Sequence, residues 1–133
     1  MIAQYAEVPE RSVLVVEDDE ATRKTIKKVM ESEGWTVDLA KDGAVGLERA
    51  AEQAYDLILL DLMMPVLDGF EFLQTLRTGG LRSSESPVVV VTAKNLDDAD
   101  KALLEGSVHQ VVAKSGDDLD LLISDAAKYL DGP

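Results

Sequence analysis

Short apolar runs alternate with amphipathic stretches along most of this chain. The apolar runs are bounded by turn-forming residues, and LILL at residues 57–60 is continuous, as is typical of strands buried on both faces of a parallel sheet. The predicted strands cover residues 12–16, 35–40, 56–60, 88–92 and 109–113. The predicted helices cover residues 20–33, 44–53, 69–78, 97–105 and 119–129.

The last helical stretch gives the clearest periodic signal. Its apolar residues recur at i, i+3, i+4, i+7 and i+11, which places them on one helix face. They are Leu119, Leu122, Ile123, Ala126 and Leu130. Gly34 follows the first helical stretch, in the position where a glycine usually ends a helix. Five strand–helix units in succession require a parallel sheet with right-handed crossovers and helices on both faces, so the sequence predicts an α/β fold.

We expect one domain, over residues 12–131. Residues 1–11 are interpreted as an N-terminal tail or linker, because they lack the basic start and apolar core of a signal peptide. Residues 79–87, with the sequence GGLRSSESP, are expected to form a flexible loop before the fourth strand. With 46% hydrophobic residues, the chain of 133 residues can bury a full core without covalent cross-links.

The amino-acid composition excludes several classes of function. The chain has no cysteine, which excludes disulfides and thiolate metal sites and makes a reducing cytoplasm the expected compartment. No apolar run approaches the roughly 20 residues that span a bilayer. Twenty-six acidic and thirteen basic residues give a net charge of −13, so direct nucleic-acid binding is not expected. Most of this charge serves solubility, but acids gathered at one edge would attract a divalent cation.

Polar residues follow four of the predicted strands. The first strand runs into Glu17 and Asp18, the third into Asp61, the fourth ends on Thr92 and the fifth ends near Lys114. Each has an ordinary explanation when taken singly, since acids favour helix starts, threonine suits strands and lysine often lies at a sheet edge. In a doubly wound sheet, however, these four strands are neighbours, and ligands bind at this edge.

The combined residue types indicate phosphoryl chemistry. Three crowded carboxylates either raise a pKa or hold a hard cation through oxygen atoms, and Mg²⁺ fits such a donor set. Beside the cation, Asp61 can stay ionised and attack a phosphoryl group. Thr92, Lys114 and the metal would share the charge on the phosphoryl oxygens, and the product would be an aspartyl phosphate.

Four motifs in this order resemble the receiver domains of two-component response regulators. They are VLVVEDDE at residues 13–20, LLDLMMPVLDG at 59–69, VVVVTA at 88–93 and VVAK at 111–114. The resemblance covers residues 12–130. It implies a flavodoxin-like, doubly wound (βα)5 fold with a parallel five-stranded sheet of order 2-1-3-4-5.

The resemblance also implies a function. Asp61 would be the phosphoacceptor, with a histidine kinase or a His-containing phosphotransfer domain as the donor. Mg²⁺ would be held by Asp18, Asp61 and the backbone carbonyl of Met63, with Glu17 acting through water. The domain would catalyse only its own phosphotransfer and dephosphorylation, so it would not be an enzyme in the usual sense.

Thr92 and Lys114 would contact the phosphoryl group, and two departures from the family pattern lie near them. Val111 stands where many receivers carry a Tyr or Phe that swings in behind the threonine, so we expect the response at residues 92–98 instead. Ser115 replaces the usual proline, and a trans bond before it is expected because a cis bond there costs about 2.5–4 kcal/mol.

The fourth strand–helix unit resembles receivers attached to hybrid sensor kinases.

Two alternatives remain open. A phosphatase of the haloacid-dehalogenase type also uses a strand-end Asp with Mg²⁺, but it needs a second acid where this chain has Met63. A receiver-like interaction module that is never phosphorylated usually lacks an acid, the threonine or the lysine, and this sequence has them all. The printed chain carries no output domain, so we expect signalling through protein–protein contacts, with a partner and an oligomeric state that the sequence does not identify.

Overall fold

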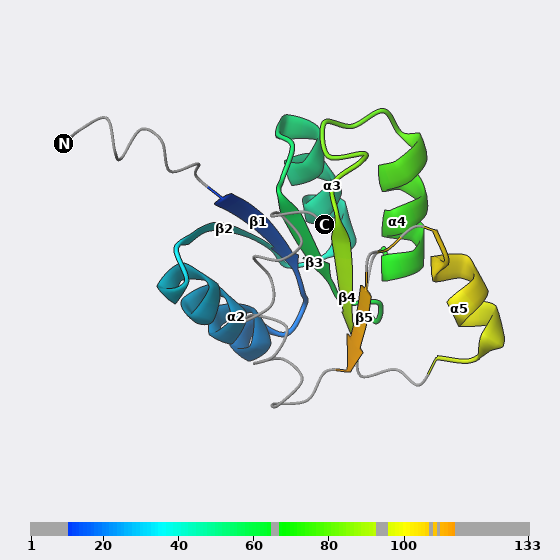
Figure 1. The fold of residues 1–133 in the computed structure, drawn as a ribbon, viewed down its shortest axis with the longest axis horizontal. Coiled ribbons are helices and arrows are strands. Elements are labelled where there is room, and N and C mark those ends of the chain that lie inside the picture. Colours follow the sequence, from blue (N-terminus) through cyan, green and yellow to red (C-terminus); the bar gives the residue numbers. More distant parts are fainter. Residues whose placement is uncertain (1–10, 65–66, 93–95, 107, 109, 114–133) are drawn as a thin grey trace.

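The computed structural model describes residues 11–64, 67–92, 96–106, 108 and 110–113. The described strands are β1 (Arg11–Val16), β2 (Trp35–Ala40), β3 (Leu57–Leu60), β4 (Val88–Thr92) and β5 (Gln110–Ala113) (Figure 1). The described helices are α2 (Glu20–Ser32), α3 (Gly43–Glu52), α4 (Gly69–Thr78) and α5 (Asp98–Leu104). Strands and helices alternate along the chain, which confirms the α/β class.

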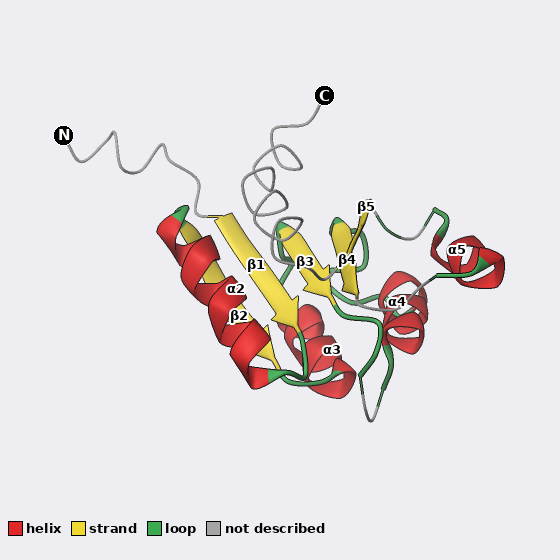
Figure 2. Ribbon diagram, turned by 90° about the horizontal axis from the view of Figure 1, so that it is seen from below, coloured by secondary structure: helices red, strands yellow, loops and turns green. Residues whose placement is uncertain are grey.

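The strands form one sheet, with the order β2-β1-β3-β4-β5 and parallel pairing throughout. Helix α2 covers one face of the sheet, and α3 and α4 cover the other (Figure 2). The order reverses between β1 and β3, so a crevice for a ligand is expected at the carboxyl ends of these two strands. The register places Val16 at the end of β1 opposite Leu60 at the end of β3.

The core consists of two apolar layers, one on each face of the sheet. Alternation along β1 sends Val13 and Val15 into the layer under α2, while Leu14 and Val16 enter the layer under α3 and α4. All four residues of β3 are buried, as predicted for a strand covered on both faces. Strand β3 is therefore shielded from water on both faces.

The predicted element boundaries are close to the observed ones. Strands 35–40 and 88–92 and helix 69–78 agree to the residue, and the other described elements differ by one residue at one or both ends. Aspartate caps explain two of the differences: Asp42 accepts a hydrogen bond from Val45 N–H, and Asp97 from Asp100 N–H.

Two predictions about helix ends have different outcomes. Gly34 has a φ of 93°, which confirms that it ends α2 in the left-handed region. The predicted helix at 119–129 lies outside the described residues.

Residues 79–87 form a loop before β4, as predicted, and buried hydrogen bonds anchor this loop. Ser83 is fully buried, its hydroxyl donates to the Gln53 carbonyl at 2.7 Å, and it accepts the Tyr55 N–H at 2.9 Å. The Ser86 hydroxyl donates to the Tyr55 carbonyl at 2.6 Å. The two serine hydroxyls thus serve as hydrogen-bond partners for backbone groups just before β3.

Two longer side chains add hydrogen bonds to those of Ser83 and Ser86. Arg77 directs Nη1 to the carbonyls of Ser84 and Ser86 at 2.9 and 2.8 Å, and burial lowers the pKa of its guanidinium. The Tyr55 hydroxyl donates to Asp38 at 2.6 Å, and burial together with this hydrogen bond raises the pKa of Tyr55. The loop is thus tied to α4 and to the segment between α3 and β3, which Tyr55 in turn joins to β2.

We expect Ser83→Ala to lower the free energy of unfolding by about 1–3 kcal/mol, because it leaves a buried N–H and a carbonyl without partners. Urea denaturation measures this loss. Ser84→Ala is the matched control in the same loop and should change stability by less than about 0.5 kcal/mol. Equal losses in the two variants would contradict the anchoring role of Ser83.

Candidate functional site

The carboxyl end of β1 presents two acids in different environments. Glu17 is only 2% exposed, its N–H donates to the Ala40 carbonyl at 3.0 Å, and its carboxylate accepts the Asp19 N–H at 3.0 Å. Asp18 is exposed. Burying a charged carboxylate costs free energy unless hydrogen-bond donors or cations stabilise its negative charge. The burial of Glu17 therefore indicates that such donors or a cation belong to this site.

The start of α2 fixes the backbone that carries these acids. Asp19 caps the helix by accepting the Thr22 N–H at 2.8 Å. Arg23, one turn into the helix, donates from Nη1 to the carbonyls of Glu17 at 2.8 Å and Asp18 at 3.2 Å. The sequence did not suggest this role for Arg23, because nothing in its spacing separates it from the other basic residues of the helix.

The carboxyl end of β3 supplies the third acid. Asp61 is 4% exposed, and its N–H donates to the Val16 carbonyl at 3.0 Å, which extends the pairing of β3 with β1. Its carboxylate accepts the Met63 N–H at 3.2 Å. The chain therefore turns directly after Asp61 and holds the carboxylate toward the sheet edge. The Met63 side chain is 59% exposed beside it.

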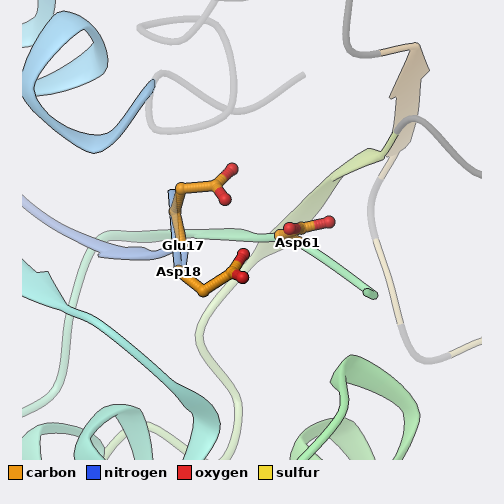
Figure 3. Close-up of side chains that lie close together, drawn as sticks. All are labelled: Glu17, Asp18 and Asp61. Carbon is orange, nitrogen blue, oxygen red and sulfur yellow. The ribbon is translucent and has the colours of Figure 1, made fainter. Parts of the chain in front are cut away.

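The structure brings the three predicted acids together. One carboxylate oxygen each from Glu17, Asp18 and Asp61 lies within 4.8 Å of the other two, and Figure 3 shows the three side chains converging from two strand ends. Like charges at this separation repel strongly, above all where burial reduces screening by water. Three hard oxygen donors in one crevice fit a divalent cation such as Mg²⁺.

Thr92 and Lys114 were the other predicted site residues. Thr92 ends β4 at the same sheet edge, is buried, and lies opposite Ala113 of β5. Lys114, Ser115 and the peptide bond between them lie outside the described residues. Val111, within β5, is half exposed.

Gly69 is a site residue whose role was not apparent from the sequence. Its N–H donates to the Leu62 carbonyl at 3.0 Å, and a Cβ there would lie 2.6 Å from Leu62 Cα and 2.8 Å from the Asp61 carbonyl oxygen. Only glycine lets α4 begin this close to the backbone that carries Asp61.

The family comparison agrees with this geometry. Residues 13–124 match the model of the response regulator receiver domain. The chain belongs to this family, and it is a signalling module of the two-component system. Family membership argues against the haloacid-dehalogenase alternative.

Among curated proteins, the response regulator ArlR of Staphylococcus saprophyticus is 39% identical over 83 residues, which cover 62% of this chain and 36% of ArlR. The transcriptional regulatory protein PcoR of Escherichia coli is 40% identical over 96 residues, which cover 71% of this chain and 41% of PcoR. The chain thus spans well under half the length of these relatives.

A solved structure gives the same fold with a metal. The receiver domain of the sensor histidine kinase PA1611 from Pseudomonas aeruginosa PAO1 has a magnesium ion coordinated in its active site cleft. It is 26% identical, with a TM-score of 0.80, and the alignment covers 93% of this chain and 100% of that one. The flavodoxin-like receiver fold is therefore confirmed. The resemblance to receivers of hybrid kinases stays a prediction, since response regulators match as well.

None of the helices in the described part of the chain has the length and apolar character that a membrane span requires.

We expect Gly69→Ala to cost roughly 1–3 kcal/mol of unfolding free energy, because the new methyl group meets backbone atoms that cannot move aside cheaply. Its amide NMR spectrum should show shifts at Asp61 and Met63. Gly34→Ala is the control: its Cβ meets no atom within 4 Å, so only the positive φ costs stability, and the site amides should not move. Unchanged Asp61 and Met63 amides in Gly69→Ala would contradict the close approach.

Proposed function

We propose that this domain accepts a phosphoryl group on Asp61 from the phosphohistidine of a histidine kinase or a His-containing phosphotransfer domain. The observation that carries the proposal is the convergence of Glu17, Asp18 and Asp61 within 4.8 Å at the switch point of the sheet. An interaction module that never takes phosphate has no need to keep buried acids together, so this geometry favours phosphorylation over that alternative.

Asp61 is placed to act as the nucleophile. One carboxylate oxygen forms a bond to phosphorus while the bond between phosphorus and the donor imidazole nitrogen breaks, and the imidazole leaves as a neutral ring once it takes a proton. The Met63 N–H, 3.2 Å from the carboxylate, fixes the orientation of Asp61 for this attack. The same domain would catalyse the later hydrolysis of its aspartyl phosphate and no reaction on another substrate.

The acid cluster would hold Mg²⁺ through Asp18, Asp61 and the backbone carbonyl of Met63, with Glu17 acting through water. When bound, the ion offsets the negative charge of the carboxylates and of the phosphoryl oxygens. The magnesium ion in the PA1611 receiver supports this assignment.

Thr92 and Lys114 would bind the phosphoryl group itself. The Thr92 hydroxyl, buried at the end of β4, would donate to a phosphoryl oxygen, and the Lys114 ammonium would neutralise a second one. Because Val111 cannot replace an aromatic ring behind the threonine, we infer that the response to phosphate lies in the backbone of residues 92–98. The signal would then pass to a protein partner.

We also propose the domain limits and compartment. Residues 12–131 would complete the (βα)5 domain with the sheet order 2-1-3-4-5, and residues 1–11 would be a tail or linker. The order of the described strands supports the first of these proposals. A cytoplasmic location fits a chain without cysteine.

Incubation with acetyl phosphate and Mg²⁺, followed by intact mass spectrometry, tests the phosphoacceptor. We expect the mass of the wild-type protein to rise by one phosphoryl group, and Asp61→Asn or a chelator to abolish the change. Asp18→Asn should slow it, because one proposed metal ligand is lost. Asp98→Asn, an exposed acid outside the cluster, is the control and should react like the wild type. Equal phosphorylation of Asp61→Asn would refute the assignment.

A further inference from the structure

Helices α4 and α5 lie on the flank of the molecule away from β1 and β2 (Figures 1 and 2). A groove is lined by residues of α4 and its N-cap and by Leu103 of α5. The apolar residues that line it are Phe70 and Leu73 of α4 and Leu103 of α5. Leu103 is 64% exposed, the largest exposed fraction of any large apolar side chain in the described part of the chain. The groove shares no side chain with the acid cluster.

The two leucines of α5 point in different directions. Leu104 is buried in the core layer that contains α4, whereas Leu103 lines the groove. Leu73 is buried beneath the groove and Phe70 is partly buried, so together they form an apolar floor. An aliphatic side chain seated between Leu103 and this floor would lose most of its contact with water. Exposed apolar surface of this kind often marks an interaction site.

The charges around the groove are mainly negative. Asp68 and Glu71 line it where α4 begins, and Glu71 is exposed. Arg77 is the basic residue among the described lining residues, but its Nη1 donates to two carbonyls of the loop at 79–87. With a net charge of −13 for the whole chain, this surface complements a positively charged partner.

A second copy of this chain is a poor match in its described part. Helix α5 exposes Leu103 and Lys101, but it is only seven residues long and carries Asp98 and Asp100, which the acidic groove would repel. The most basic described helix is α2, in which Lys24 and Lys27 pair with glutamates of the same helix and Lys28 is exposed. Its large apolar residues, Ile26 and Met30, are buried under the sheet. The groove therefore suits a helix from a different protein, with both aliphatic and basic residues on its surface.

We propose that the α4–α5 groove docks a basic amphipathic helix of a partner protein. The aliphatic face of that helix would seat against Leu103 and Phe70, and its lysine or arginine side chains would face Asp68 and Glu71. This is the helix-in-groove mode of recognition, which uses apolar anchors at i, i+3, i+4 and i+7. Docking of this kind does not require a phosphate on Asp61, so it can be tested whether or not the phosphoacceptor assignment holds.

The probe is a fluorescent peptide of about 18 residues, long enough to form a helix, with leucine at i, i+3, i+4 and i+7 and mainly lysine and alanine elsewhere. Fluorescence anisotropy should show saturable binding to the wild-type domain, and the amide shifts should fall in α4 and α5. We expect Leu103→Ser to weaken binding by about tenfold or more, since a buried aliphatic contact is lost. Glu71→Gln should weaken it by about twofold to fivefold.

Three controls decide the result. Glu48→Gln changes an exposed glutamate of α3 outside the groove and should bind like the wild type. A scrambled peptide of the same composition should bind weakly, because its leucines no longer share one face. Thermal melts should show that Leu103→Ser, a change at an exposed site, stays folded.

Two outcomes would overturn the proposal. If the scrambled peptide binds as tightly, or Leu103→Ser has no effect, the peptide only adheres to a negative surface. If the groove amides shift with protein concentration and light scattering reports a dimer, a second copy of the chain occupies the groove instead.

Discussion

The parallel pairing of β1 with β3 is the constraint on which the site depends. Both strands are buried on both faces, so their register is fixed by the two core layers, and the Asp61 N–H continues the pairing onto the Val16 carbonyl at 3.0 Å. As a result, Glu17, Asp18 and Asp61 meet at one edge although like charges repel. The energy of the packed sheet holds them within 4.8 Å, and a cation binding there would relieve that repulsion.

Much of the fold and the acid cluster could be predicted from the sequence because the underlying signals are local. A continuous apolar run such as 57–60 identifies a buried strand, and an acid directly after it identifies the edge to which that acid belongs. In a doubly wound sheet the ends of the first and third strands are neighbours, so this topology predicts that Glu17, Asp18 and Asp61 meet. The family resemblance added the sheet order and the roles of the individual residues.

The omissions concern interactions between segments distant in the sequence. Ser83 was predicted to lie in a loop, and its hydroxyl joins Gln53 and Tyr55, which no local pattern encodes. The role of Gly69 was not predicted, because the close backbone approach that it permits is seen only in the assembled structure. The groove beside Leu103 also could not be predicted from local patterns. Leu103 is exposed and Leu104 is buried because of the way in which α5 packs against the rest of the fold.

The central claim is that the three carboxylates form a site for one divalent cation beside Asp61. Anomalous diffraction from crystals grown with Mn²⁺, an oxygen-seeking substitute for Mg²⁺, measures the position of that ion directly. We expect a single strong peak in contact with the carboxylates of Asp18 and Asp61 and near the Met63 carbonyl, and its loss in Asp18→Asn. A peak that persists in Asp18→Asn, or one located instead among the acids at the start of α5, would contradict the account.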